Sequence, residues 1–299
     1  MRGKRVAPLL ICTVGMLLLI LDARSALMAA SEGISACISA VIPSLFPFFV
    51  LSAIINSALL GVRIPLLRPL SKLCRIPDGT ESLMLLGLIG GYPVGAAGIR
   101  NAYDRGALNK TDAERMLSFC NNAGPSFIFG ILSLQLGNVG LCFALWGIHI
   151  LSAVIVGALM PGQSEHRGRI SSLPPISLTQ AMQIGIRNIA NVCGWVILFR
   201  IVIGFFERWV LWALPSWASI LLVGFAELTN GCLALGRIEA LSLRFMFASV
   251  FLAFGGICVS MQTASVSGRL SLQKYYIGKL LQTGISLILS GIFVILLSV

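Results

Sequence analysis

Polar residues that could contact a substrate occur in three short motifs within or beside apolar sequence. "GLIGGYPVGA" covers residues 87–96, "NNAGP" covers 121–125 and "ELTNG" covers 227–231. An acid beside a helix break in apolar sequence, such as Glu227, is energetically expensive and needs a reason. Its carboxylate could carry a proton, help to hold a cation, or pair with Arg200. The alternative is an ordinary charge at the end of an interfacial helix.

The "NNAGP" motif predicts a helix that stops and then restarts. Residues 111–114 have the sequence of a capping box, which predicts a helix over 112–120. Proline favours the first turn of a helix, so a second helix is expected over 126–136. Free N–H groups at 122–126 would then form an anion-binding site, to which two asparagine side chains add donors and acceptors. The alternative is that these asparagines only cap the broken ends.

The surrounding sequence places these motifs in a membrane. Of 299 residues, 57% are hydrophobic and 11% are charged, and the mean hydropathy is +0.93. This composition indicates an integral membrane protein. Because one span needs about 20 apolar residues, the apolar runs predict membrane elements, with two spans in the fourth run: 6–21, 33–62, 82–99, 116–164, 186–206, 209–226, 245–268 and 280–299.

The net charge of +11 is spread over short loops and does not form one patch. Basic residues occur after Met1 and in the stretches 63–75, 100–115 and 167–169. This distribution follows the positive-inside rule and argues against nucleic acid as a partner. The basic start and the apolar run after it resemble a signal sequence without a clean cleavage motif, which favours an uncleaved signal-anchor helix over 1–32 with a cytosolic amino terminus.

The segment 82–99 poses a topological problem, because basic stretches that should both be cytosolic lie on either side of it. A re-entrant hairpin that turns at Gly90–Pro93 keeps both stretches on one side. Broken backbone at membrane depth is tolerated where protein covers it or where it lines a cavity. A glycine-rich contact between helices is the alternative.

The carboxyl-terminal half repeats this order of motifs. Loose correspondences link 41–55 with 191–204, 85–100 with 222–237, and "LSFCNNAGPSFIFG" with 252–268. The two copies start on opposite sides, so the sequence predicts inverted repeats and a secondary transporter with a site at the midplane. The expected protein is an all-α polytopic membrane protein with three spans and one re-entrant hairpin per repeat. Its parts are the anchor 1–32, a first repeat 33–165, a cytosolic linker 166–176 and a second repeat 177–299.

The breaks supply the candidate site. We expect Glu227 to be the coupling or gating acid, and "SMQTASVSG" (260–268) to line a polar cavity unless its hydroxyls bond back to their own helix. The candidate substrate-binding residues are Gly90, Gly91, Tyr92, Pro93, Asn121, Asn122, Gly124, Pro125, Ser126, Thr229, Asn230 and Gln262. Eight scattered cysteines and two distant histidines predict no metal or cofactor. An enzyme is not expected, because no paired aspartate, HExxH motif or nucleophile with a placed base is evident.

These motifs also carry a resemblance. "GGYPVGA", "AYDRGALNKTDAERMLSFCNNAGPSFIFG" and "ELTNG" resemble the sporulation integral membrane protein family called YlbJ or SpoVV. Members of this family contain nucleoside-recognition (Gate) segments similar to concentrative nucleoside transporters. The resemblance covers residues 35–299 and is densest over 87–130. It implies a role in endospore formation, in the outer forespore membrane of the mother cell, where the family is thought to move dipicolinate.

The resemblance and the motifs together predict a transporter that moves a small organic anion by alternating access. Helix starts at Pro93 and Pro125 would meet the carboxylates of dipicolinate, and Tyr92 could stack on its ring. A nucleoside would suit the polar residues equally well, and a sporulation scaffold without transport activity is a further alternative. The expected partners are the lipid bilayer, the substrate, a coupling proton or sodium ion, and a second copy of the chain.

Overall fold

The computed structural model describes residues 3–162 and 176–297, and all regular secondary structure in these two ranges is helical. Five segments are long and apolar enough to cross a membrane. They are Ala23–Leu59, which comprises α2 (Ala23–Ala36), η1 (Cys37–Val41) and α3 (Ile42–Leu59), then α10 (Val139–Leu159), α11 (Leu178–Trp209), α14 with α15 (Leu241–Ser267), and α16 (Gln273–Leu297). The predicted all-α polytopic fold is confirmed.

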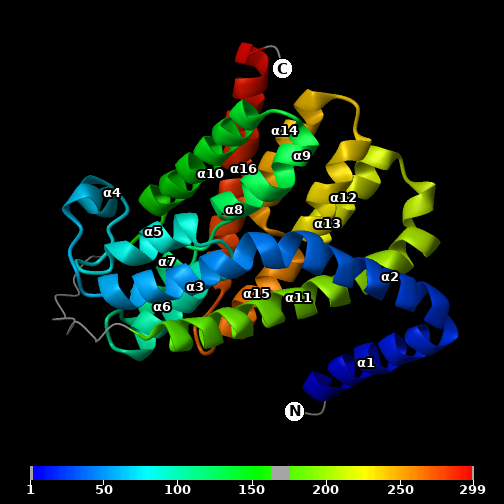
Figure 1. The fold of residues 1–299 in the computed structure, drawn as a ribbon, viewed down its shortest axis with the longest axis horizontal. Helices are drawn as coiled ribbons and strands as arrows, with labels where there is room; N and C mark the ends of the chain where they lie inside the picture. The colour runs from blue at the N-terminus through cyan, green and yellow to red at the C-terminus, as the bar shows by residue number, and fades with distance from the viewer. Residues whose placement is uncertain (1–2, 163–175, 298–299) are drawn as a thin grey trace.

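The amino-terminal helix α1 (Gly3–Leu21) turns at Asp22 into the long helix that contains α2 and α3. This long helix begins at Ala23 and continues past residue 33, where the apolar run predicted its start. It lies along α11 (Figure 1), and the two helices approach closely because glycines remove side-chain bulk. A Cβ atom on Gly33 would lie 3.0 Å from the Cα atom of Ile197.

The predicted hairpin at 82–99 is present. Helices α5 (Glu81–Ile89) and α6 (Val94–Asp104) pack against each other, and Gly90–Pro93 form the turn between them. Both arms also contact a second backbone segment. A Cβ atom would lie 2.1 Å from the carbonyl oxygen of Cys120 if placed on Gly87, and 1.9 Å from it if placed on Gly95. The glycines therefore serve a close contact between segments as well as the hairpin turn.

A second hairpin enters from the opposite end of the molecule (Figure 1). It consists of α12 (Ser216–Ala226) and α13 (Leu228–Ala234), which meet at Glu227. Gly224 and Gly231 bring the arms together, since a Cβ atom on Gly231 would lie 2.2 Å from the Cα atom of Gly224.

Each hairpin is followed by a broken segment. The first comprises α7 (Lys110–Met116), an irregular stretch, α8 (Pro125–Phe127), η3 (Ile128–Leu132) and α9 (Ser133–Leu136). The second joins α14 (Leu241–Phe254) to α15 (Gly256–Ser267) through Gly255, where Gly255 and Gly256 have φ values of 81° and 82°. A side chain would be strained in this left-handed conformation, so glycine suits the break.

The capping box predicted at 111–114 is wrong. Helix α7 is capped by Asn109, whose side-chain oxygen accepts a hydrogen bond from the Asp112 N–H at 2.7 Å. Glu114 accepts a hydrogen bond from the Ser271 N–H at 2.8 Å. Asparagine is as good an N-cap as threonine, and Glu114 stabilises a contact with a distant loop.

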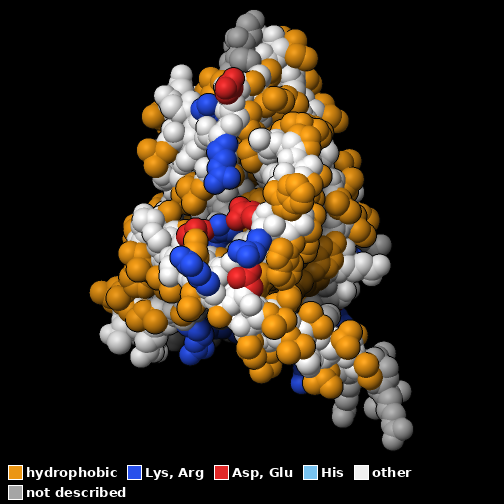
Figure 2. All heavy atoms as spheres, turned by 90° about the vertical axis from the view of Figure 1, so that its right-hand side faces the viewer, with side chains coloured by type: hydrophobic (Ala, Val, Ile, Leu, Met, Phe, Trp, Pro, Cys, Tyr) orange, Lys and Arg blue, Asp and Glu red, His pale blue; other side chains and the backbone are white. Residues whose placement is uncertain are grey.

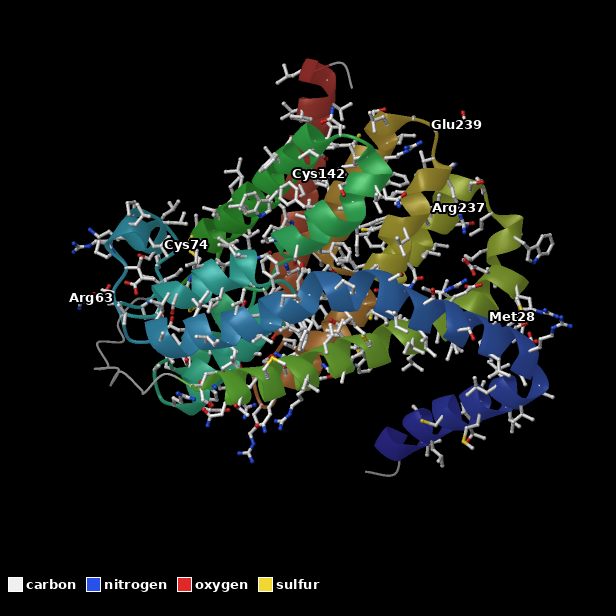
Figure 3. The ribbon with its side chains drawn as sticks, viewed as in Figure 1. Met28, Arg63, Cys74, Cys142, Arg237 and Glu239 are labelled. Carbon is white, nitrogen blue, oxygen red and sulfur yellow. The ribbon has the colours of Figure 1, made fainter. Side chains whose placement is uncertain are left out.

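The order of long helix, hairpin, broken segment and continuous helix occurs twice, first from α2 to α10 and then from α11 to α16. The division into repeats 33–165 and 177–299 stays a prediction. All but the last residue of the predicted linker 166–176 lies outside the described residues. Arg63 and Cys74 lie at one end of the molecule, and Arg237 and Glu239 at the other (Figure 3). The short helices η2 (Pro65–Leu67), α4 (Arg68–Leu73), η4 (Leu211–Ala213) and η5 (Leu235–Arg237) complete the two ends.

Candidate functional site

The two hairpin tips approach a common buried cavity of about 30 Å³. Its polar lining comes from all three sequence motifs, through Tyr92, Gly124, Glu227 and Thr229, and from Gln262 on α15. Apolar side chains complete the wall: Val41, Leu45, Ala123, Phe127, Val192, Val196, Leu228 and Val259. The structure thus brings together candidate residues that are far apart in the sequence.

Tyr92 connects the first hairpin tip to two distant helices. Its Oη atom donates a hydrogen bond to the carbonyl oxygen of Leu252 at 3.1 Å and accepts one from the Nζ atom of Lys279 at 2.9 Å. The first contact reaches the end of α14 and the second reaches α16. Tyr92 therefore ties the tip to the second half of the chain.

Lys279, Gln282 and His149 belong to this site, although the sequence analysis missed them. Lys279 Nζ also donates to Gln282 Oε1 at 2.8 Å and to Asn122 Oδ1 at 3.2 Å. Gln282 Nε2 donates to Asn122 Oδ1 at 3.0 Å. Lys279 directly precedes the apolar run 280–299, where a lysine resembles the boundary of a span. Only the structure shows that Lys279 is buried, because it places this residue inside the continuous helix α16.

Asn121 and Asn122 join separate segments of the chain. Asn121 Oδ1 accepts a hydrogen bond from the Ala96 N–H at 3.2 Å, and its Nδ2 donates to Thr263 Oγ1 at 2.9 Å. This residue therefore bridges α6 and α15 across the broken segment. Asn122 Nδ2 donates to the carbonyl oxygen of Phe119 at 2.6 Å, while its Oδ1 faces Lys279 and Gln282.

The expectation of free N–H groups at 122–126 is partly wrong. The Asn122 N–H donates to the carbonyl oxygen of Gly87 at 3.1 Å, and the Ala123 N–H donates to His149 Nε2 at 3.2 Å. Buried backbone donors are almost always paired, and here the hairpin and α10 supply the acceptors. These two amides are consequently not available to an anion in this conformation.

Glu227 is an N-cap and not a partner of Arg200. Its Oε1 accepts from the Thr229 N–H at 3.0 Å, and its Oε2 accepts from the N–H and Nδ2 of Asn230 at 2.6 and 2.7 Å. Arg200 instead pairs with Glu32 and with Glu207. Glu227 as a whole is 1% exposed, which also contradicts the alternative of an interfacial charge.

The other predicted residues lie in the first hairpin tip, at the start of α8 and on α15. Gly90, Gly91 and Pro93 form the backbone of the first tip, and Gly91 has a φ value of 79°. Pro125 and Ser126 begin α8. In the stretch 260–268, Ser260, Thr263 and Ser265 donate to carbonyl oxygens four residues earlier. The alternative that these hydroxyls bond back to their own helix is therefore confirmed, and Gln262 is the residue of this stretch that lines the cavity.

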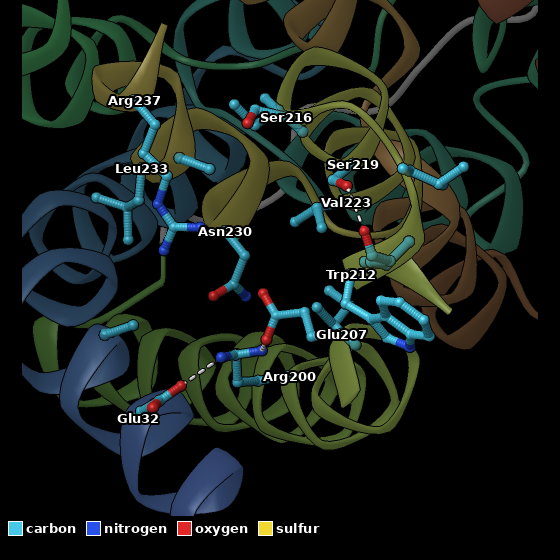
Figure 4. A pocket seen from close by; sticks show the side chains of 16 residues that line it. Glu32, Arg200, Glu207, Trp212, Ser216, Ser219, Val223, Asn230, Leu233 and Arg237 are labelled. Carbon is cyan, nitrogen blue, oxygen red and sulfur yellow. Dashed lines mark hydrogen bonds and ion pairs between the residues drawn. The ribbon is translucent and has the colours of Figure 1, made fainter. Parts of the chain in front are cut away.

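Larger pockets lie on either side of the central cavity. One of about 630 Å³ opens at the end that carries Glu239, where Figure 2 shows acidic and basic side chains gathered between hydrophobic surfaces. Figure 4 shows Arg200, Asn230 and Arg237 around this pocket. Asn230 also bonds to Glu227, so it connects this pocket with the central cavity.

A pocket of about 190 Å³ lies beside the first hairpin, at the end that carries the basic loops. Its polar groups come from Ser52, Asn56, Asn101, Arg105 and Asn188.

Within residues 3–162 and 176–297, no group of three or more histidine, cysteine or acidic side chains is placed to hold a metal ion.

Comparison with known proteins gives one informative similarity. No family model matches the chain, and no solved structure matches it significantly. The chain is 26% identical over 319 aligned positions to the sporulation integral membrane protein YlbJ of Bacillus subtilis (strain 168), and the alignment covers 90% of this chain and 76% of the relative. With the membrane-spanning helices, this similarity supports membership of the YlbJ family of sporulation integral membrane proteins.

Proposed function

We propose that this protein transports a small organic anion by alternating access. The observation that carries the proposal is the meeting of two hairpin tips, from opposite ends of the molecule, at one buried cavity between Tyr92 and Glu227. Broken helices at membrane depth are characteristic of transporter sites, since irregular backbone is tolerated there only where it is covered or lines a cavity.

The pockets on either side of this cavity support the same function. The pocket that reaches Asn230 and the pocket beside Asn101 lie toward opposite ends, with the hairpin tips between them. In the proposed mechanism, the tips separate one at a time, and each movement connects the central cavity with one of the two pockets. Glu227 is the proposed coupling or gating acid, because its carboxylate holds the start of α13 at the second tip.

The proposed substrate is dipicolinate and the proposed location is the outer forespore membrane, both from the family resemblance. The repeated order of helices supports two inverted repeats as the basis of the mechanism.

The test is a thermal-shift titration of the purified protein in detergent with dipicolinate, and with uridine as comparison. A ligand that binds only the folded state raises the melting temperature with concentration. We expect a shift with dipicolinate, and uptake of radiolabelled dipicolinate into proteoliposomes. A shift and uptake with uridine alone would make the protein a nucleoside transporter. Folded protein that shows neither binding nor uptake would contradict the proposal and favour a scaffold.

A further inference from the structure

A buried cation beside the central cavity has no acidic partner. Lys279 is 1% exposed, and its amine donates to Tyr92 Oη, Gln282 Oε1 and Asn122 Oδ1 at 2.8–3.2 Å. All three acceptors are uncharged. Among the residues that the structure describes, no carboxylate lies within ion-pair distance of this amine. The three acceptors orient the amine, but they leave its charge uncompensated.

A second buried cation shows how the same fold holds a charge with a structural role. Arg115 is also fully buried, and its Nε lies 3.9 Å from Asp112 Oδ1. Its Nη1 and Nη2 donate to the carbonyl oxygens of Cys74 and Arg75 at 2.8 and 2.5 Å. Burying a charge without an opposite charge is expensive. Lys279 therefore needs an explanation that Arg115 does not.

The position of Lys279 supplies that explanation. Its amine contacts the hydroxyl of Tyr92, and Tyr92 lines the central cavity. The amine thus lies directly behind the cavity wall, and the group in front of it belongs to a hairpin tip. Displacement of that tip would remove the tyrosine hydroxyl that lies between the amine and the cavity.

A further unused donor lies in the same cluster. His149 is 2% exposed, and its Nε2 accepts from the Ala123 N–H, which places the ring hydrogen on Nδ1. No described residue accepts a hydrogen bond from this Nδ1. The backbone carbonyl of His149 accepts from Gln282 Nε2 at 3.4 Å. Buried donors without acceptors are uncommon, so this Nδ1 is a second polar group of the cluster whose partner is not among the described residues.

The acid on the other side of the cavity does not serve as the counter-ion. Both oxygens of Glu227 accept N–H groups at the start of α13. Three uncharged N–H donors therefore hold this carboxylate at the start of α13, just as three uncharged acceptors hold the amine of Lys279. Among the described residues, neither of these two buried ionisable groups pairs with an opposite charge, and of the two only the amine would attract an anion.

We propose that Lys279 is the anion-binding residue of the transport site. When the tip that carries Tyr92 moves, the amine exchanges the tyrosine hydroxyl for a carboxylate oxygen of the substrate. This inference rests on the proposed transport function and deepens it, because it selects a carboxylate anion over a neutral nucleoside.

The experiment is a thermal-shift titration of the full chain in detergent with dipicolinate, its neutral dimethyl ester and uridine. In the wild-type protein, we expect only dipicolinate to raise the melting temperature at low concentration. Lys279→Gln should weaken dipicolinate binding roughly 10- to 100-fold, the loss typical of a hydrogen bond to a charged group. Lys274→Gln is the matched control, because it removes the same charge from the first turn of α16 and should bind as the wild type does. Lys274 Nζ hydrogen-bonds to the carbonyl oxygen of Thr111 at 3.5 Å and forms no ion pair among the described residues.

A second variant keeps the test decisive if Lys279→Gln does not fold. Gln282→Glu places a carboxylate where Gln282 Oε1 lies 2.8 Å from the amine. The change also removes the Nε2 donor to Asn122 Oδ1 and to the carbonyl oxygen of His149, so the melting temperature is checked first. In folded protein, this internal counter-ion should abolish dipicolinate binding. Unchanged dipicolinate binding in folded Gln282→Glu protein, or equal binding of the ester and the dianion, would overturn the inference. Wild-type binding and uptake of uridine alone would overturn it while transport stands, whereas no binding and no uptake would remove the proposed function as well.

Discussion

The Nζ atom of Lys279 lies 2.9 Å from the Oη atom of Tyr92, although 187 residues separate them in the chain. This contact joins the tip of the first hairpin to the last helix. Since Tyr92 Oη also donates to the carbonyl oxygen of Leu252, the tip is held at two points on the second half of the chain. Movement of this tip must break both hydrogen bonds, which makes the contact a place where a bound anion can influence the hairpin.

The hydrogen bonds of Asn121 to Ala96 and Thr263 predict that substitutions of Asn121 and Thr263 affect stability non-additively. Asn121→Ala removes the acceptor of the Ala96 N–H and the donor to Thr263. Leaving buried polar groups without partners should lower the free energy of unfolding by about 1–3 kcal/mol. The measurement is reversible unfolding in mixed micelles of Asn121→Ala, Thr263→Val and the double variant. Strictly additive effects of the two changes would contradict a direct contact, because contacting residues couple energetically.

Asn122→Ala should act differently, because Asn122 accepts from Lys279 and Gln282. We expect folded protein with weakened dipicolinate binding and lost uptake. Binding is measured by thermal-shift titration, and uptake in proteoliposomes at equal protein abundance. Wild-type uptake by this variant would remove Asn122 from the substrate site.

Close contacts of the first hairpin predict that it does not tolerate a methyl group. A Cβ atom on Gly95 would lie 1.9 Å from the carbonyl oxygen of Cys120, so Gly95→Ala should destabilise the fold by about 3 kcal/mol or more. Gly147→Ala is the control, because no described atom beyond the neighbouring residues and the local backbone of α10 lies within 4 Å of a Cβ atom placed there. There, replacing glycine in a helix should be neutral or stabilising by up to about 1 kcal/mol. Melting temperatures that fall equally in both variants would contradict the close packing.

The hairpin topology predicts that residues 78 and 106 are accessible from the same side of the membrane. Cysteine labelling in intact vesicles, in a Cys12→Ala/Cys193→Ala background, tests Asp78→Cys and Gly106→Cys, both at exposed positions. Glu239→Cys should label from the opposite side, since Glu239 lies at the other end of the molecule (Figure 3). Labelling of positions 78 and 106 from opposite sides would defeat the re-entrant hairpin.

Glu227→Gln tests the proposed coupling role. The glutamine has a similar shape and still offers an oxygen to the N–H groups at the start of α13, so we expect folded protein that binds dipicolinate. If Glu227 carries the coupling proton, this variant should exchange dipicolinate across proteoliposomes but should not accumulate it against a gradient. Accumulation equal to that of the wild type would limit Glu227 to helix capping, a role whose loss in Glu227→Ala typically costs about 0.5–2 kcal/mol.

The sequence alone determined the class of the protein, its helices and the positions of their breaks. These features depend on local properties: apolar runs form membrane helices, and "GGYP", "NNAGP" and "ELTNG" interrupt them. The hairpin at 82–99 was also predictable, because two basic loops have to lie on one side of the membrane.

Only the tertiary structure decided which polar groups meet and what each one does. Asn121 reaches Thr263 across 142 residues, and Asn122 reaches Gln282 across 160 residues. The anchoring of Tyr92 by Lys279, the capping role of Glu227 and the pairing of the amides at 122–123 all follow from such contacts. Hydropathy and spacing predict which segments enter the membrane, but the partners of a buried polar group depend on how those segments pack.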